Sequence, residues 1–140
     1  MTVGEWDPYR RDCPSRRLLD RLGDRWTVLL VGALDPGPRR FTELAAAVEG
    51  ISQKMLTQTL RSLERDGFVA RTAYPVVPPH VEYELTDLGR ALQEPLRALE
   101  RWAIEHMDAV VAQQDAYDGL RMPAAGRIRE STPPAPSTER

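Results

Sequence analysis

Residues 50–67 read GISQKMLTQTLRSLERDG, and this stretch carries the signals for the start, the faces and the end of one helix. Ser52 can cap the helix, because its hydroxyl can accept a hydrogen bond from a first-turn amide that has no partner inside the helix. Gly67 can end it, since glycine readily takes the left-handed conformation that follows many helices. The apolar residues in between recur at spacings of three and four, which predicts a stripe facing a core: Met55, Leu56, Leu60 and Leu63.

The other face of this helix is polar and partly basic. It carries Gln53, Lys54, Thr57, Gln58 and Arg61, of which residues 53, 57 and 61 are successive neighbours along the helix. Amides, hydroxyls and cations are the groups that contact DNA bases and phosphates. The same pattern is also typical of the solvated side of an ordinary amphipathic helix. The segments that flank the helix must decide between the two interpretations.

The flanking segments favour a DNA-binding arrangement. Residues 42–48 predict a short supporting helix, and residues 68–74 and 81–85 predict two antiparallel strands. The loop between the strands contains three prolines, which cannot donate to a strand ladder and which stiffen the loop. Two helices, a turn and a two-stranded wing in this order predict a winged helix-turn-helix. This is a mainly α fold with a small β-wing (α+β), whose polar helix enters the major groove.

Outlying basic side chains extend the predicted contacts. Arg39 and Arg40 precede the short helix, and His80 lies beside the proline-containing loop of the wing. Ser52 is included because its cap would direct the start of the polar helix toward DNA. The predicted DNA-contacting residues are Arg39, Arg40, Ser52, Gln53, Lys54, Thr57, Gln58, Arg61 and His80.

Three further helices are expected outside this region. Residues 14–22 have an apolar face, residues 26–34 are nearly all apolar and predict a buried central helix, and Thr86 can cap a long final helix. The apolar stripe of the final helix is longer than one small domain is expected to cover, so a second subunit is the simplest explanation. The residues predicted on these N- and C-terminal dimerisation helices are Leu18, Leu22, Leu92, Leu96, Leu99, Trp102, Ala103 and Met107.

Several motifs follow one another over about residues 13–105. They are Cys13-Pro14, Gly23-Asp-Arg-Trp26, Arg40-Phe41-Thr-Glu-Leu44, Ile51-Ser52-Gln-Lys-Met55-Leu56, Leu63-Glu-Arg-Asp-Gly67, Val81-Glu-Tyr-Glu-Leu-Thr86-Asp-Leu-Gly89 and Trp102. In order and spacing they resemble the HxlR-type family of bacterial winged-helix regulators, a relative of the MarR group. The resemblance implies an obligate homodimer that binds operator DNA and represses or activates nearby genes. It implies no catalytic activity.

Composition bounds the remaining possibilities. The 140 residues fit one domain, expected over residues 13–116, between a flexible arm at 1–12 and a disordered tail at 117–140. With neither a membrane-length apolar run nor a signal peptide, we expect a cytoplasmic protein without a membrane partner. The net charge of −2 is unusual for DNA binding, but residues 39–71 hold six basic side chains against four acidic ones. Such a local field matters more than the total charge.

Cys13 is the only thiol of the chain. It matches the N-terminal cysteine position of the resembled family, where some members sense oxidants or electrophiles. The dipole of the following helix, together with Arg10, Arg11, Arg16 and Arg17, would favour the reactive thiolate. An oxidant or a small-molecule effector would then be a further partner. The alternative is that Cys13 packs as a small apolar residue without a signalling role.

No metal, cofactor or catalytic centre is expected. His80 and His106 lie far apart and lack companions at metal-ligand spacing, and the glycines form no phosphate-binding motif. Two classes of function remain. The first is a sequence-specific DNA-binding regulator that binds an inverted-repeat operator as a homodimer. The second is a winged-helix protein-interaction module that does not bind DNA.

Overall fold

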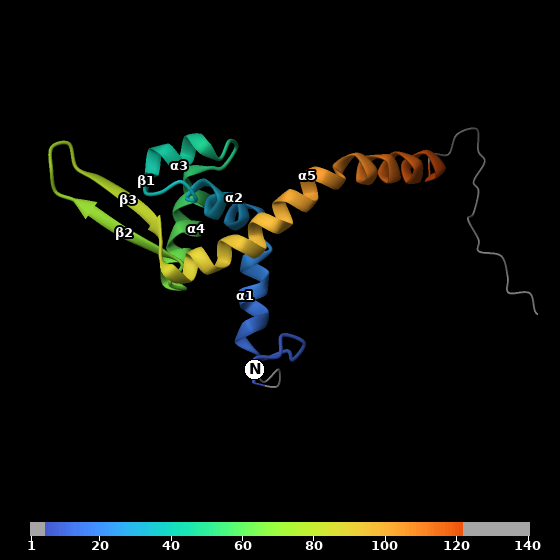
Figure 1. Cartoon of the computed structure of the whole chain (residues 1–140), viewed down its shortest axis with the longest axis horizontal. Coiled ribbons are helices and arrows are strands. Elements are labelled where there is room, and N and C mark those ends of the chain that lie inside the picture. The colour runs from blue at the N-terminus through green and yellow to red at the C-terminus, as the bar shows by residue number, and fades with distance from the viewer. Residues whose placement is uncertain (1–4, 122–140) are drawn as a thin grey trace, which may run out of the picture. The chain divides into compact units, whose positions relative to one another are not determined.

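The computed structural model of the chain describes residues 5–121. Along this part the elements are α1 (Pro14–Leu22), α2 (Arg25–Ala33), β1 (Arg39–Arg40), α3 (Phe41–Ala47), α4 (Gln53–Arg65), β2 (Val69–Tyr74), β3 (His80–Leu85) and α5 (Asp87–Arg121) (Figure 1). Helices α3 and α4 form a helix-turn-helix, and β2 and β3 form the wing that follows it. The mainly α fold with a small β-wing is confirmed.

The sheet has three strands rather than the predicted two. β3 lies in the middle and pairs antiparallel with β2 on one side and with the two-residue β1 on the other. Arg39 pairs with Tyr83 and Arg40 with Glu82. The third strand joins the segment before α3 to the wing, so the helix-turn-helix and the wing are held together through backbone hydrogen bonds.

Leucines from α2, α3 and α4 form the centre of the core. Leu30 of α2, Leu44 of α3 and Leu56 of α4 are fully buried, and Leu85 at the end of β3 closes the cluster. Burying one such side chain contributes about 1.5–3 kcal/mol. The central helix is buried on one face only, because Leu29 is 40% exposed. The predicted central helix packs into the core through Thr27, Leu30 and Val31.

Short polar contacts fix the ends of the helices. The Ser52 hydroxyl accepts a hydrogen bond from the Met55 amide at 3.0 Å, and the Thr86 hydroxyl accepts one from the Gly89 amide at 3.1 Å. Both predicted caps are confirmed. Gly67 follows α4 with a φ of +86°, the left-handed conformation that the sequence predicted there.

Two sets of polar side-chain contacts join α1 to the end of α4 and α5 to the turn after α2. Arg21 of α1 forms an ion pair with Asp66 at the end of α4. Asp35, in the turn after α2, accepts hydrogen bonds from Gln93 and Arg97 of α5. These contacts explain how α1 and the first part of α5 are oriented against α2 and α4.

Both ends of the described part differ from expectation. The segment 5–12, predicted as a flexible arm, forms turns that lie on the start of α1, where the Ser15 hydroxyl donates to the Trp6 carbonyl at 2.9 Å. α5 continues to Arg121, so the disordered tail cannot begin at Tyr117. The helix holds there because residues 117–121 contain no proline and the Arg121 guanidinium lies over the Tyr117 ring, at 5.6 Å. Residues 1–4 and 122–140 lie outside the described part.

The chain divides within α5 into two compact units, Met1–Glu100 and Arg101–Arg140. The described residues of the first unit contain the helix-turn-helix, the wing and the start of α5. Those of the second unit belong to the rest of α5. Within residues 5–121, no helix combines the length and the apolarity that crossing a membrane requires.

Candidate nucleic-acid interface

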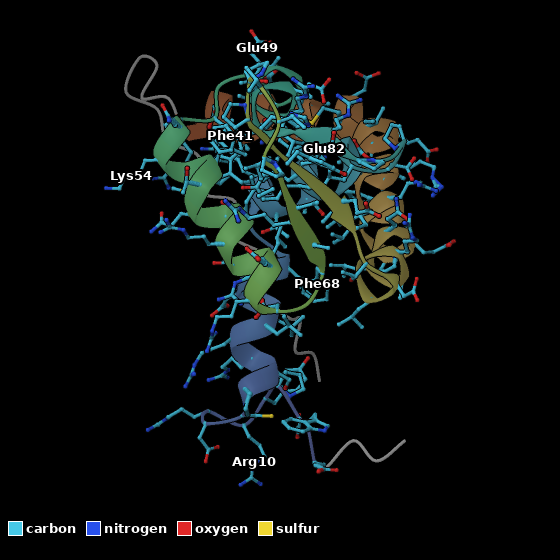
Figure 2. All side chains as sticks on the ribbon, turned by 90° about the vertical axis from the view of Figure 1, so that its left-hand side faces the viewer. Arg10, Phe41, Glu49, Lys54, Phe68 and Glu82 are labelled. Atoms are coloured by element: carbon cyan, nitrogen blue, oxygen red, sulfur yellow. The ribbon has the colours of Figure 1, made fainter. Side chains whose placement is uncertain are left out.

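α4 presents the five predicted polar side chains on one continuous surface. Gln53, Lys54, Thr57, Gln58 and Arg61 line an open groove of about 610 Å³, and all of its lining residues belong to α4. Four of them are exposed and Thr57 is half-buried. Figure 2 shows Lys54 projecting outward from α4, away from the helices packed behind it. We call this surface the α4 face.

The opposite side of α4 is anchored in the core. Leu56, Leu60 and Leu63 are at most 1% exposed, so the helix cannot rotate about its axis without exposing them. The Ser52 cap fixes the first turn, and the amides that remain unpaired at this end of a helix favour a negatively charged group. The α4 face is therefore held rigidly, with two cations, two amides and a hydroxyl available to a ligand.

The two outlying arginines lie in the sheet and not on the α4 face. Arg39 is half-buried and Arg40 is exposed, both within β1. The backbone amide of Arg40 donates to the Glu43 carboxylate at 2.7 Å, which ties this strand to the first turn of α3.

His80 is engaged within the wing. Its ring stacks on Tyr74, with the centroids 4.9 Å apart, and its Nε2 lies 3.4 Å from a carboxylate oxygen of Glu82. These contacts come from the strand register, which pairs Tyr74 with His80. The neighbouring loop instead exposes apolar side chains, Val76 at 51% and Val77 at 96%. The structure thus does not bring His80 to the α4 face.

The predicted dimerisation residues fall into two groups. Leu18, Leu22 and Leu92 pack partly against the core of their own chain, and Leu96 belongs to that core at 7% exposure. Leu96 is therefore corrected from an interface residue to a core residue, because its turn of α5 faces inward. Leu99 is 52% exposed. In the second unit Trp102, Ala103 and Met107 are all exposed.

Cys13 precedes α1 as its N-cap residue and is 8% exposed. Its Sγ lies 3.0 Å from the Ser15 hydroxyl. Residues 5–12 cover this end of α1, and one of the arginines expected to act on the thiol is engaged there, since Arg16 Nε donates to the Pro8 carbonyl at 3.1 Å. The surroundings of the thiol are more enclosed than a freely reactive cysteine requires.

Two buried hydroxyls were missed from the sequence. Thr27 of α2 is 1% exposed and Thr59 of α4 is 8% exposed, whereas Met55, predicted to face the core, is 36% exposed. The spacing contained a usable signal, because positions 56, 59, 60 and 63 match one helical face better than a set that includes position 55.

Among residues 5–121, no group of three or more His, Cys, Asp or Glu side chains is placed to hold a metal ion.

A polar helix, α4, that packs on α2 and is followed by a β-wing defines a winged helix-turn-helix protein. A family model described as HxlR-like helix-turn-helix matches residues 21–111. The HTH-type transcriptional regulator YtfH of Escherichia coli K12 is 46% identical over 111 residues, which are 79% of this chain and 88% of that protein. The chain belongs to the HxlR-like helix-turn-helix family of transcriptional regulators.

Solved structures give the same result. A structure of the transcriptional regulator YtfH from Salmonella typhimurium has a TM-score of 0.73 at 45% identity and covers 76% of this chain and 96% of that one. The redox regulator HypR in its reduced form has a TM-score of 0.65 at 37% identity, covering 71% of this chain and 98% of that one. The family match over residues 21–111 includes the helix-turn-helix, the wing and most of α5.

Proposed function

We propose that the protein is a sequence-specific DNA-binding transcriptional regulator that binds an inverted-repeat operator as a homodimer. The observation that carries the proposal is the α4 face, in which five polar side chains gather on one rigid helix. Arg61 and Lys54 can neutralise phosphates or contact guanine, and Gln53 and Gln58 can make paired hydrogen bonds with adenine. Thr57 adds a hydroxyl that can donate or accept a hydrogen bond with several of the bases.

The charge distribution supports DNA over a protein partner. Residues 39–71 hold six basic and four acidic side chains, whereas residues 82–118 hold nine acidic and three basic ones. Phosphate contacts supply most of the affinity of a DNA-binding protein, so a locally basic surface is the feature that such binding needs. All five side chains of the α4 face are polar or charged, whereas the centre of a protein interface is typically depleted of charged residues.

Dimerisation would cover the apolar side chains that α5 exposes. Leu99 is 52% exposed in the first unit, and Trp102, Ile104 and Met107 are between 47% and 71% exposed in the second. Exposed apolar residues in such number along one helix are typical of an interface. A dimer with two-fold symmetry would present two copies of α4, one from each protomer. If the two copies lie about 34 Å apart, they match operator half-sites separated by one turn of DNA.

A redox response through Cys13 is the second part of the proposal. HypR, which shares the fold at 37% identity, is described as a redox regulator. Cys13 is the N-cap residue of α1 and the only thiol of the sequence. Its burial means that an oxidant must displace residues 5–12 or act slowly.

A DNA-binding regulator needs access to the chromosome, so we propose that the protein acts in the cytoplasm. We propose no catalytic role for it.

DNA binding is tested directly with the DNA that flanks the gene of this protein. Fluorescence anisotropy of labelled fragments, measured from 50 to 300 mM salt, gives an affinity and its salt dependence. We expect log K to fall linearly with log salt, with a slope near −0.9 for each phosphate contact. A protein that binds none of these fragments more tightly than unrelated DNA would contradict the proposal and favour the protein-interaction module.

A further inference from the structure

A second groove lies on the flank of α4, where α4 meets α1 and α2. It has a volume of about 430 Å³, within the range of small-molecule sites in proteins. Its lining includes Arg17 and Asp20 of α1, Thr27 of α2, and Met55, Gln58 and Thr59 of α4. We call it the α1–α4 groove. The DNA-binding role proposed above does not require it.

The bottom of the α1–α4 groove contains two hydroxyls. Thr27 is 1% exposed and Thr59 is 8% exposed, and both line the groove. Within residues 5–121, neither hydroxyl makes a hydrogen bond through its side chain. The hydroxyls of Ser15 and Ser52, in contrast, each have a hydrogen-bond partner. Because a buried hydroxyl without a partner costs free energy, a polar ligand in the groove would be stabilised there.

The charges at the rim of the groove restrict the ligand. Arg21 is paired with Asp66, and the Asp24 carboxylate accepts a hydrogen bond from the Trp26 amide at 3.1 Å. Arg17 and Asp20 are exposed, and neither takes part in an ion pair within the described part of the chain. One cation and one anion therefore remain available beside the groove. A phosphate backbone would meet Asp20 unfavourably, whereas a ligand that carries both charges would match the pair.

Gln58 connects the α1–α4 groove to the α4 face, because it lines both. A ligand in the groove that contacts the Gln58 amide would compete with a base for the same side chain. Met55 is 36% exposed and supplies an apolar wall next to it. Gln58 is therefore the residue through which a ligand in the groove would affect DNA binding.

We propose that the α1–α4 groove is an effector site for a zwitterionic α-amino acid with a small side chain, and that its occupation weakens operator binding. The ligand carboxylate pairs with Arg17 and its ammonium with Asp20. The same carboxylate accepts a hydrogen bond from the Thr59 hydroxyl, and the side chain of the ligand lies against Met55. The effect on DNA rests on the proposed function, whereas the binding of the amino acid does not.

The first experiment measures binding without DNA. The full-length wild-type protein is mixed with each of the twenty protein amino acids at 1 mM, and contact is detected by saturation-transfer NMR. We expect at least one to bind, and its N-acetylated amide, which lacks both charges, to fail. Thr59→Val keeps the shape of the side chain but removes the hydroxyl, so it should weaken binding at least tenfold. Thr57→Val is the matched control on the same helix and should bind normally.

The second experiment adds operator DNA. A saturating amount of the bound amino acid should lower the operator affinity of the wild type by about 5- to 150-fold, the usual range of such coupling. Thr59→Val should bind the operator normally and not respond. If no amino acid binds at 1 mM, or if Thr59→Val and Arg17→Ala both bind it as well as the wild type, the site is wrong. If an amino acid binds but the operator affinity does not change, the coupling through Gln58 is wrong. A protein that binds an amino acid but no DNA would refute only the proposed function.

Discussion

Replacing Gly89 by alanine should destabilise the protein, because no room exists for a methyl group at this position. Gly89 lies in the first turn of α5, where a Cβ atom would come within 2.1 Å of the Phe68 carbonyl oxygen. That oxygen already accepts a hydrogen bond from the Thr86 amide at 3.0 Å. The close approach is what attaches the start of α5 to the end of the helix-turn-helix.

The size of the effect follows from the geometry. The contact is more than 1 Å shorter than the 3.4 Å at which ordinary contacts begin, and the atom it meets is backbone. Overpacking of this kind costs about 1–3 kcal/mol, and a backbone neighbour places Gly89→Ala near the upper end. Alanine returns up to about 1 kcal/mol through its higher helix propensity. We therefore expect a net loss of about 2 kcal/mol in the free energy of unfolding.

Urea denaturation followed by circular dichroism measures this loss. All variants must be compared at one protein concentration, because the stability of a dimer depends on concentration. Gly119→Ala is the matched control on α5, since nothing lies within 4 Å of its Cβ position. It should be neutral or stabilising by up to about 1 kcal/mol. If Gly89→Ala is as stable as the wild type, the packing of α5 on Phe68 is wrong.

Three further predictions concern the α4 cap, the interface and the thiol. Ser52→Ala removes the acceptor of the Met55 amide and should lower the free energy of unfolding by about 1 kcal/mol in urea; an unchanged midpoint would show that the cap contributes nothing. Leu99→Glu places a charge among the exposed apolar side chains of α5 and should prevent dimerisation. Light scattering at micromolar concentration should then detect a monomer, and an intact dimer would exclude an interface at Leu99. Diamide should release the wild type from its operator but not Cys13→Ser; equal responses would make Cys13 structural.

Much of the fold could be predicted because its signals are local. The Ser52 and Thr86 caps and the left-handed Gly67 all lie within a few residues of the ends that they mark. β1 could not be predicted, since two consecutive arginines show no strand pattern and pair with β3, more than forty positions away along the chain. A contact at that sequence distance depends on how the helices between them pack.

In the candidate site, too, some features follow from local sequence patterns and others depend on the folded structure. The five residues of the α4 face could be grouped from the sequence because they share one helical period, and their contact with DNA stays a prediction. Thr59 was missed as a buried residue and Met55 was placed in the core, because only apolar residues were counted when the buried face of α4 was assigned. Leu96 was assigned to an interface because an apolar stripe does not reveal which of its members the same chain covers. His80 was expected near DNA, and only the strand register pairs it with Tyr74.

The central claim is that the α4 face reads DNA, and the operator affinities of three alanine variants test it most directly. Arg61→Ala should lose about 1–3 kcal/mol of specific binding, which is roughly 5- to 150-fold. Lys54→Ala should weaken all DNA sequences alike and reduce the salt slope by about 1. Arg90→Ala removes an exposed arginine of α5 and should bind like the wild type. Unchanged operator affinity in both Lys54→Ala and Arg61→Ala would contradict the account.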